Sequence, residues 1–281
     1  MPGVRIVTDS SCDLSQQEAA ELGVAVVPLT IRFGNEEFVD IEELSVADFY
    51  RRMAESSDLP ETAAPAPGRF EEAFRRLAGE GADTVVCINL SSDLSATIES
   101  ARNGARAVAD TVEVRVIDSR TLTAGLGTIV LEAAKAARDG ASADDIEALA
   151  AGLITRTRVF ATLDTLDNLK KGGRIGAAQH LVGSMLSFKP VINVSEGKVE
   201  EAGRARTRKK SLLWLRDKLF EEPTVEHLAV CDGEAPDVDE FLDLIAERYP
   251  RDQIRTGRIG AVIGAHGGPR LVGICYLTAT T

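Results

Sequence analysis

Three serines and a threonine lie within residues 90–97, LSSDLSAT. An apolar run at 84–89 precedes them and predicts a buried strand, whereas apolar residues with 3-4-3 spacing follow and predict a helix. The first backbone N–H groups of a helix lack partners within it and favour an anion. Hydroxyl donors at this point can therefore hold a carboxylate or a phosphate. The alternative is a polar turn in which Ser92, Asp93 or Ser95 caps the helix.

Two further expected strands also end in small polar residues. Thr8-Asp9-Ser10-Ser11 follows the strand at 4–7, and Asp118-Ser119 follows the strand at 112–117. In open α/β sheets, ligands bind beyond the carboxyl ends of the strands, so we expect a site where these clusters meet. Helix caps also follow parallel strands, which leaves a purely structural role open.

Nitrogen donors occur in two glycine-rich segments. His266 lies in an expected loop, where its imidazole can donate a hydrogen bond to an anion or bond to neighbouring backbone. Lys170, Lys171 and Arg174 surround a glycine pair and form either a phosphate-facing loop or a solvated one.

The densest basic run is RARTRKK at 204–210, at the start of a helix expected over 204–220. It is either a solvated face or a docking surface for an acidic partner. The net charge of -12 argues against a general nucleic-acid binder, which needs a basic footprint.

No strong catalytic or metal-binding motif is present. The chain has neither a P-loop nor a G-x-S-x-G elbow, and its four cysteines and three histidines show no ligand spacing, so we expect no metal and no cofactor. Ser95, His266 and Asp9 can be assembled into a triad on paper. A hydrolase or transferase acting on an acyl ester or thioester, with Ser95 or Ser92 as nucleophile, is therefore the alternative function.

Composition and periodicity predict the architecture that positions these residues. The chain has 281 residues, 44% of them hydrophobic, which suits one large or two ordinary globular domains. Strands and helices alternate in the first half, which predicts an α/β domain at 1–160 with a mainly parallel sheet flanked by helices. A hairpin at 189–200 predicts a smaller α+β domain at 161–281 with a mixed or antiparallel sheet. The proline-rich segment 60–67 is an expected loop, with Pro67 opening the next helix.

No signal peptide and no long apolar span are evident. We therefore expect a cytoplasmic protein without stable membrane insertion.

Taken together and in order, the motifs resemble those of the DegV family of bacterial fatty-acid-binding proteins, from end to end. Residues 8–11 are similar to the family's TDSS start, and residues 90–97 to its LSSxLSGT motif. LKKGGRI at 169–175, Lys189-Pro190 and HGGP at 266–269 follow in family order. Each motif alone has little specificity, whereas their order and spacing are specific.

The resemblance implies a non-catalytic protein that holds one long-chain fatty acid in an apolar tunnel between two domains. Family members of this kind are the binding subunit of a fatty acid kinase and present the acyl carboxylate to a separate kinase subunit. We expect the binding subunit to be a monomer.

The resemblance also implies roles for individual residues. Thr62 and Ser95 are expected to hold the carboxylate, and His266 to belong to the same network. Arg174 is associated with the exposed carboxyl end and kinase engagement. We add Ser92, a second hydroxyl of the 90–97 turn, to the expected ligand-binding residues.

Three segments depart from the family pattern. The family's TSQPS loop reads TAAPA here, with Ala63, Ala64 and Ala66 in place of polar residues. The glycine of LSGT is Ala96, and Arg270 adds a cation after the HGGP segment. These departures bear on the geometry around the acid's head group.

Overall fold

A parallel four-stranded sheet forms the first part of the computed structural model, which describes residues 3–56, 58–181 and 188–279. All neighbouring strands in this sheet are parallel, as predicted. Its strand order is β2 (Ala25–Val27), β1 (Gly3–Asp9), β6 (Ala82–Asn89) and β7 (Glu113–Asp118).

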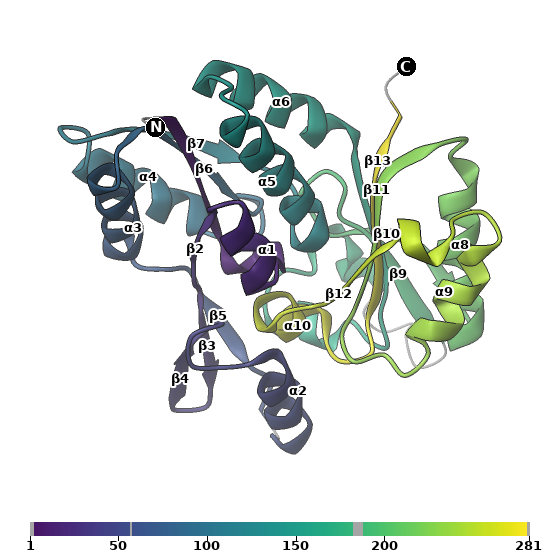
Figure 1. Ribbon diagram of the computed structural model, residues 1–281. Helices are drawn as coiled ribbons and strands as arrows, with labels where there is room; N and C mark the ends of the chain where they lie inside the picture. The colour runs from purple at the N-terminus through teal and green to yellow at the C-terminus, as the bar shows by residue number, and fades with distance from the viewer. Residues whose placement is uncertain (1–2, 57, 182–187, 280–281) are drawn as a thin grey trace.

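Helices cover both faces of this sheet (Figure 1). Side chains alternate along the strands, so Val85 and Cys87 pack under one helix pair while Val86 and Ile88 pack under the other. The first pair is α3 (Pro67–Gly79) and α4 (Thr97–Ala107), and the second is α5 (Thr123–Arg138) and α6 (Ala143–Arg156). Pro67 opens α3 as predicted. The short helices η1 (Ser10–Cys12) and α1 (Gln16–Glu21) follow β1.

A mixed six-stranded sheet forms the second part, which confirms the predicted α+β character. Its order is β10 (Glu200–Ala205), β9 (Lys189–Asn193), β8 (Thr157–Thr162), β13 (Val272–Thr278), β11 (Val225–Asp232) and β12 (Arg255–Arg258). Only β11 and β12 are parallel neighbours. The division predicted between residues 160 and 161 falls inside β8, which lies wholly in this sheet. Helices α8 (Arg208–Glu221) and α9 (Val238–Ala246) cover its outer face (Figure 1).

A small antiparallel sheet joins the two parts (Figure 1). It has the order β4 (Glu36–Val39), β3 (Thr30–Phe33) and β5 (Glu61–Ala63). Together with α2 (Val46–Glu55) it packs against α10 (Ala261–Gly267), which precedes β13. The other short helices among the described residues are α7 (Asp167–Lys171), η2 (Gly176–Leu181) and η4 (Arg251–Gln253).

Three local predictions were wrong. The helix expected from 204 begins only at Arg208, because Arg204 and Ala205 pair with β9 and the Thr207 hydroxyl caps the helix. The segment 60–67 was expected to be a loop but contains β5. The strand is compatible with the prolines of this segment because β5 lies at the edge of its sheet and all three prolines flank it. His266 lies in helix α10 rather than in a loop. Within the described ranges, no helix combines the length and the hydrophobicity needed to span a membrane.

Candidate functional site

An apolar cavity lies between the inner face of the six-stranded sheet, the start of α5, the turn after β6 and α10. Strand alternation builds its floor. Ala161, Cys231 and Cys275 face the cavity, while Phe160 and Val230 point the other way, under α8 and α9. Leucine, isoleucine and valine side chains supply most of the remaining lining, including Leu29, Leu90, Leu122, Leu163, Ile192 and Val194.

The cavity is large enough to hold a small-molecule ligand. Its volume is about 150 Å³, roughly five times the volume that one water occupies in the liquid. Its apolar walls offer water few hydrogen-bond partners. The cavity therefore favours an apolar ligand, with orientation set by a few polar groups.

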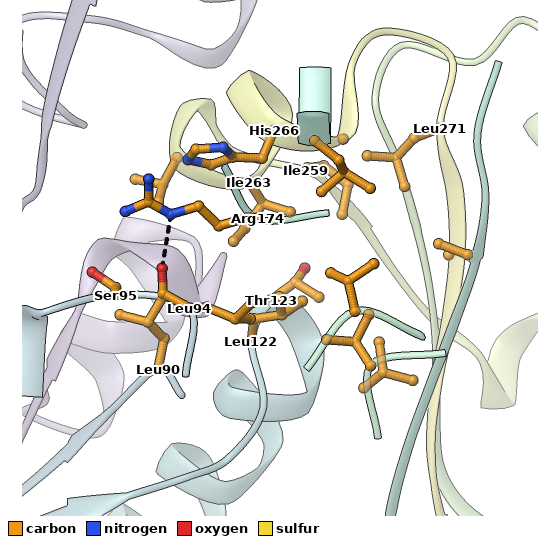
Figure 2. Close-up of a pocket in the computed structure, with 18 of the residues that line it drawn as sticks. Leu90, Leu94, Ser95, Leu122, Thr123, Arg174, Ile259, Ile263, His266 and Leu271 are labelled. Atoms are coloured by element: carbon orange, nitrogen blue, oxygen red, sulfur yellow. Dashed lines mark hydrogen bonds between the residues drawn. The ribbon is translucent and has the colours of Figure 1, made fainter. Parts of the chain in front are cut away.

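Those polar groups gather at one end. Figure 2 shows Ser95, Arg174 and His266 together there, with Leu271 marking the opposite, apolar end. Thr62 of β5 also lines the cavity, held in place because β5 pairs with β3. The structure thus brings four of the five predicted ligand-binding residues together, and their role in binding stays a prediction.

Thr62 and His266 form the central polar contact. Thr62 Oγ1 lies 2.8 Å from His266 Nε2, across 204 residues of sequence. Burial, together with the nearby Arg174 charge, lowers the pKa of His266 to about 4, so the ring is neutral at pH 7. If Nε2 carries the proton, it donates to Thr62, and the Thr62 hydroxyl hydrogen is then available to a ligand anion.

The other ring nitrogen, Nδ1, is buried and has no hydrogen-bond partner among the described residues. It packs against Gly172, where a Cβ would lie 2.4 Å from it. The glycine pair of the KKGGR segment therefore makes room for the imidazole.

Ser95 and Ser92 have different surroundings. Ser95 Oγ lies 2.9 Å from Thr97 Oγ1 and accepts a hydrogen bond from the Thr97 backbone N–H at 3.3 Å. Ser92 is exposed, donates to Asp118 and does not line the cavity. The structure does not bring Ser92 to the candidate site. Ala96 occupies the N-cap position of α4, so none of the three predicted capping residues does.

Arg174 crosses the mouth of the cavity. Its Nε donates to the Leu94 carbonyl at 3.1 Å, drawn as the dashed line in Figure 2. Its Nη1 donates to the Gly172 carbonyl at 2.6 Å. The side chain is exposed, so the polar end of the cavity is the end nearest solvent. Arg270 forms an ion pair with Asp164 at 3.4 Å and does not line the cavity.

The serine-hydrolase alternative gains no support from this geometry. His266 contacts Thr62, and Ser95 contacts Thr97. Asp9 accepts hydrogen bonds from Ser11, Asn89 and the Leu90 backbone, and burial raises its pKa. Within the described part of the chain, no hydrogen bond links Ser95, His266 and Asp9.

The polar strand ends lie close together, as predicted, but their side chains bond to one another. Asp9, after β1, binds the end of β6, and Asp118, after β7, binds Ser92. These side chains fasten neighbouring strand ends to one another. They do not line the cavity.

Two polar residues near the cavity, Thr123 and Asp13, were not predicted as part of a site. Thr123 lines the cavity and donates to Asp13 Oδ2 at 2.5 Å, while Asp13 Oδ1 accepts from the Gly260 N–H at 3.0 Å. Residue spacing gives no signal for this contact, because its partners are far apart in the sequence: Asp13 follows η1, Thr123 begins α5 and Gly260 precedes α10. Among the described residues, no cluster of His, Cys, Asp and Glu is arranged to hold a metal ion.

Comparison with known proteins places the chain among relatives that match it along nearly its whole length. Residues 3–279 match a family model described as "Uncharacterised protein, DegV family". A DegV domain-containing protein of Halalkalibacterium halodurans is 35% identical over 284 residues, which cover 98% of this chain and 99% of the relative. One from Streptomyces coelicolor is 35% identical over 280 residues, covering 96% and 97%.

Solved structures agree over the same length. A DegV family protein from Thermus thermophilus, described by its fatty acid binding, superposes with a TM-score of 0.89 at 30% identity, covering 99% of this chain and 100% of that one. A stearic acid-binding protein from Eubacterium ventriosum gives 0.88 at 27% identity, covering 98% of each chain. DegV of Bacillus subtilis, described as a fatty acid binding protein, gives 0.87 at 27%, covering 99% and 100%. This chain belongs to the DegV family.

Proposed function

We propose that this protein binds one long-chain fatty acid, with the tail in the apolar cavity and the carboxylate at the end lined by Thr62, Ser95 and His266. The observation that carries the proposal is the form of the cavity, which is lined mostly by apolar side chains and has Thr62, Ser95, Arg174 and His266 at its solvent-facing end. The relatives described as fatty-acid-binding proteins support the same ligand class.

The head group would be held mainly by hydroxyl donors. Thr62 and Ser95 each offer a hydroxyl, and hydrogen bonds from such donors to a carboxylate are charge-assisted. Because His266 is neutral at pH 7, it acts as a hydrogen-bonding group rather than as a counter-ion. Arg174 lines this end, and it is already hydrogen-bonded to two carbonyls.

The tail would supply most of the affinity. Each buried methylene contributes about 0.8 kcal/mol, so ten of them contribute roughly 8 kcal/mol before the cost of immobilising the chain. The head-group contacts then fix which end of the acid faces solvent.

We further propose that the protein presents the acid to a separate fatty acid kinase subunit. The exposure of Arg174 at the carboxylate end supports this, because a partner could contact that end without opening the cavity. The test is to add purified kinase subunit and ATP to the palmitate-loaded protein and trap acyl phosphate with hydroxylamine. Formation of the hydroxamate supports the proposal, and its absence with an active kinase contradicts it.

Denaturing mass spectrometry tests the binding itself. Purified protein should release a long-chain acid, and delipidated protein should bind palmitate in calorimetry. Thr62→Val and Ser95→Ala should weaken palmitate binding several-fold without unfolding the protein, whereas Ser92→Ala should not, because Ser92 faces Asp118. Delipidated protein that binds neither palmitate nor oleate would refute the proposal.

A further inference from the structure

We propose that Asp13 is a positioning residue for the ligand-binding site. Its carboxylate fastens the start of α10, and therefore His266 on that helix, to Thr123 in the opposite wall of the cavity. The proposal rests on the proposed function only in taking a fatty acid as the ligand, since the contacts that carry it are present without one.

Asp13 adds a buried polar link between two parts of the chain that are also joined by the hydrogen bonds of Thr62 with His266, Tyr50 with Ile259 and Arg174 with Leu94. Asp13 follows η1 and has a left-handed backbone, with φ 50°. Oδ2 accepts from the Thr123 hydroxyl and Oδ1 from the Gly260 N–H. Thr123 opens α5 beside the parallel sheet, whereas Gly260 precedes α10 beside the six-stranded sheet.

Gly260 is shaped for this contact. It is the N-cap of α10, and its own backbone N–H donates to Asp13, so the carboxylate takes the place that the Glu or Gln side chain of a capping box takes elsewhere. A Cβ at Gly260 would lie 2.6 Å from Asp13 Oδ1. Glycine is therefore required for the carboxylate to approach the backbone this closely.

A helix as short as α10 depends on such outside contacts, because an isolated helix of seven residues is unstable. Tyr50 donates to the Ile259 carbonyl at 3.1 Å, and Asn168 donates to the Ala265 carbonyl at 3.1 Å. Asp13 is the contact at the N-terminal end that also reaches the cavity wall through Thr123. Val262, Ile263 and His266 on this helix line the cavity, so its position sets their positions.

Burial disfavours the charged form of the Asp13 carboxylate. Burial raises the pKa of Asp13 to about 7, against the lowering effect of its hydrogen bonds from Thr123 and Gly260. The nearby charge of Asp40 contributes to the rise, and that of Arg255 opposes it. Protonation on Oδ2 is tolerated, because the Thr123 hydroxyl can turn from donor to acceptor, whereas the Gly260 N–H can only donate. The contact to α10 therefore persists in both protonation states, and an asparagine can reproduce it.

The experiment follows His266 by NMR titration in the ligand-free protein and measures palmitate affinity by calorimetry. Asp13→Leu removes both contacts, so the pKa of His266 should rise from about 4 toward its usual value of 6.5 as solvent reaches the ring. Palmitate affinity should fall by about tenfold or more, because His266 and the apolar side chains of α10 are no longer held against the ligand. Asp13→Asn should restore both readouts to near wild-type values.

Two further variants make the result decisive. Ser142→Ala weakens a cap of α6 far from the cavity and should leave both readouts unchanged although stability falls. Gly260→Ala keeps Asp13 but displaces its carboxylate, so it should change the His266 titration and the palmitate affinity as Asp13→Leu does. If the Asp13→Leu protein does not fold, Gly260→Ala takes its place in the test. Unchanged His266 titration and affinity in folded Asp13→Leu or Gly260→Ala would overturn the proposal. If the wild-type protein binds no palmitate, the proposed function fails, and the His266 titration alone still decides whether Asp13 positions α10.

Discussion

Ala161→Leu should block part of the cavity and weaken fatty acid binding. Ala161 lies on β8, is 7% exposed and faces the cavity, with Gly273 beside it on β13. Leucine adds three carbon atoms at a position where the wild-type protein has open volume rather than packed atoms. The added atoms should occupy space that the acyl tail would otherwise fill.

The magnitude follows from the displaced tail. If three methylenes lose their place in the cavity, at about 0.8 kcal/mol each, binding weakens by about 2.4 kcal/mol, or roughly 60-fold in Kd. The stability of the ligand-free protein should rise or stay the same, because the new side chain fills a void instead of overpacking a core. Weaker binding with undiminished stability is the diagnostic combination.

The assay is calorimetric titration of delipidated protein with palmitate, paired with urea unfolding of the ligand-free protein. Ala151→Leu is the matched control, since it makes the same change at an exposed position on α6 away from the cavity. Palmitate affinity within a factor of two of wild type in folded Ala161→Leu would refute the placement of the tail. A large loss of stability would show that the cavity is not open at this point.

Further predictions concern pH and surface charge. The folded-state pKa of His266 is lowered to about 4, so its contribution to stability is present above pH 6.5 and lost as pH falls through 4. In urea unfolding, His266→Gln should reduce the acid-induced loss of unfolding free energy by at most about 3 kcal/mol. Asp13 acts with the opposite sign, since its raised pKa gives a contribution that is present below pH 3.8 and lost as pH rises through 7. Asp13→Asn should therefore flatten the fall in stability between pH 4 and 7 by at most about 4 kcal/mol, and an unchanged slope would contradict the assignment. In the basic run, Arg208→Glu should lower the free energy of unfolding by roughly 2–4 kcal/mol, because Arg208 pairs with Asp237 at 2.8 Å and both side chains are largely buried. Arg206 is exposed, so Arg206→Glu should change the free energy of unfolding by less than about 0.5 kcal/mol. Arg206→Glu is thus the cleaner variant for a binding assay of this surface with an acidic partner, and unchanged binding would leave no docking role for Arg206.

The parallel sheet and its helices were predictable because local signals agreed with the tertiary structure. The apolar run at 84–89 became β6, Pro67 opened α3, and Ser142 capped α6 with Asp145. In each case the residue that favours the element locally also fits the packing around it.

Helix α10 was not predictable in this way. Its sequence, AVIGAHG, is rich in glycine and predicts a loop, yet Asp13, Tyr50 and Asn168 supply the backbone partners that the segment lacks locally. The grouping of Thr62, Ser95, Arg174 and His266 was expected from the family resemblance, not from their spacing. The orientation of Ser92 toward Asp118 depends on the register between β6 and β7, which no local pattern encodes.

A crystal structure of the delipidated protein soaked with palmitate tests the central claim most directly. We expect an acyl chain lying along Ala161, Cys231 and Cys275, with its carboxylate within hydrogen-bond distance of the Thr62 and Ser95 hydroxyls. Palmitate bound elsewhere, or bound in this cavity with its carboxylate at the Leu271 end, would contradict it.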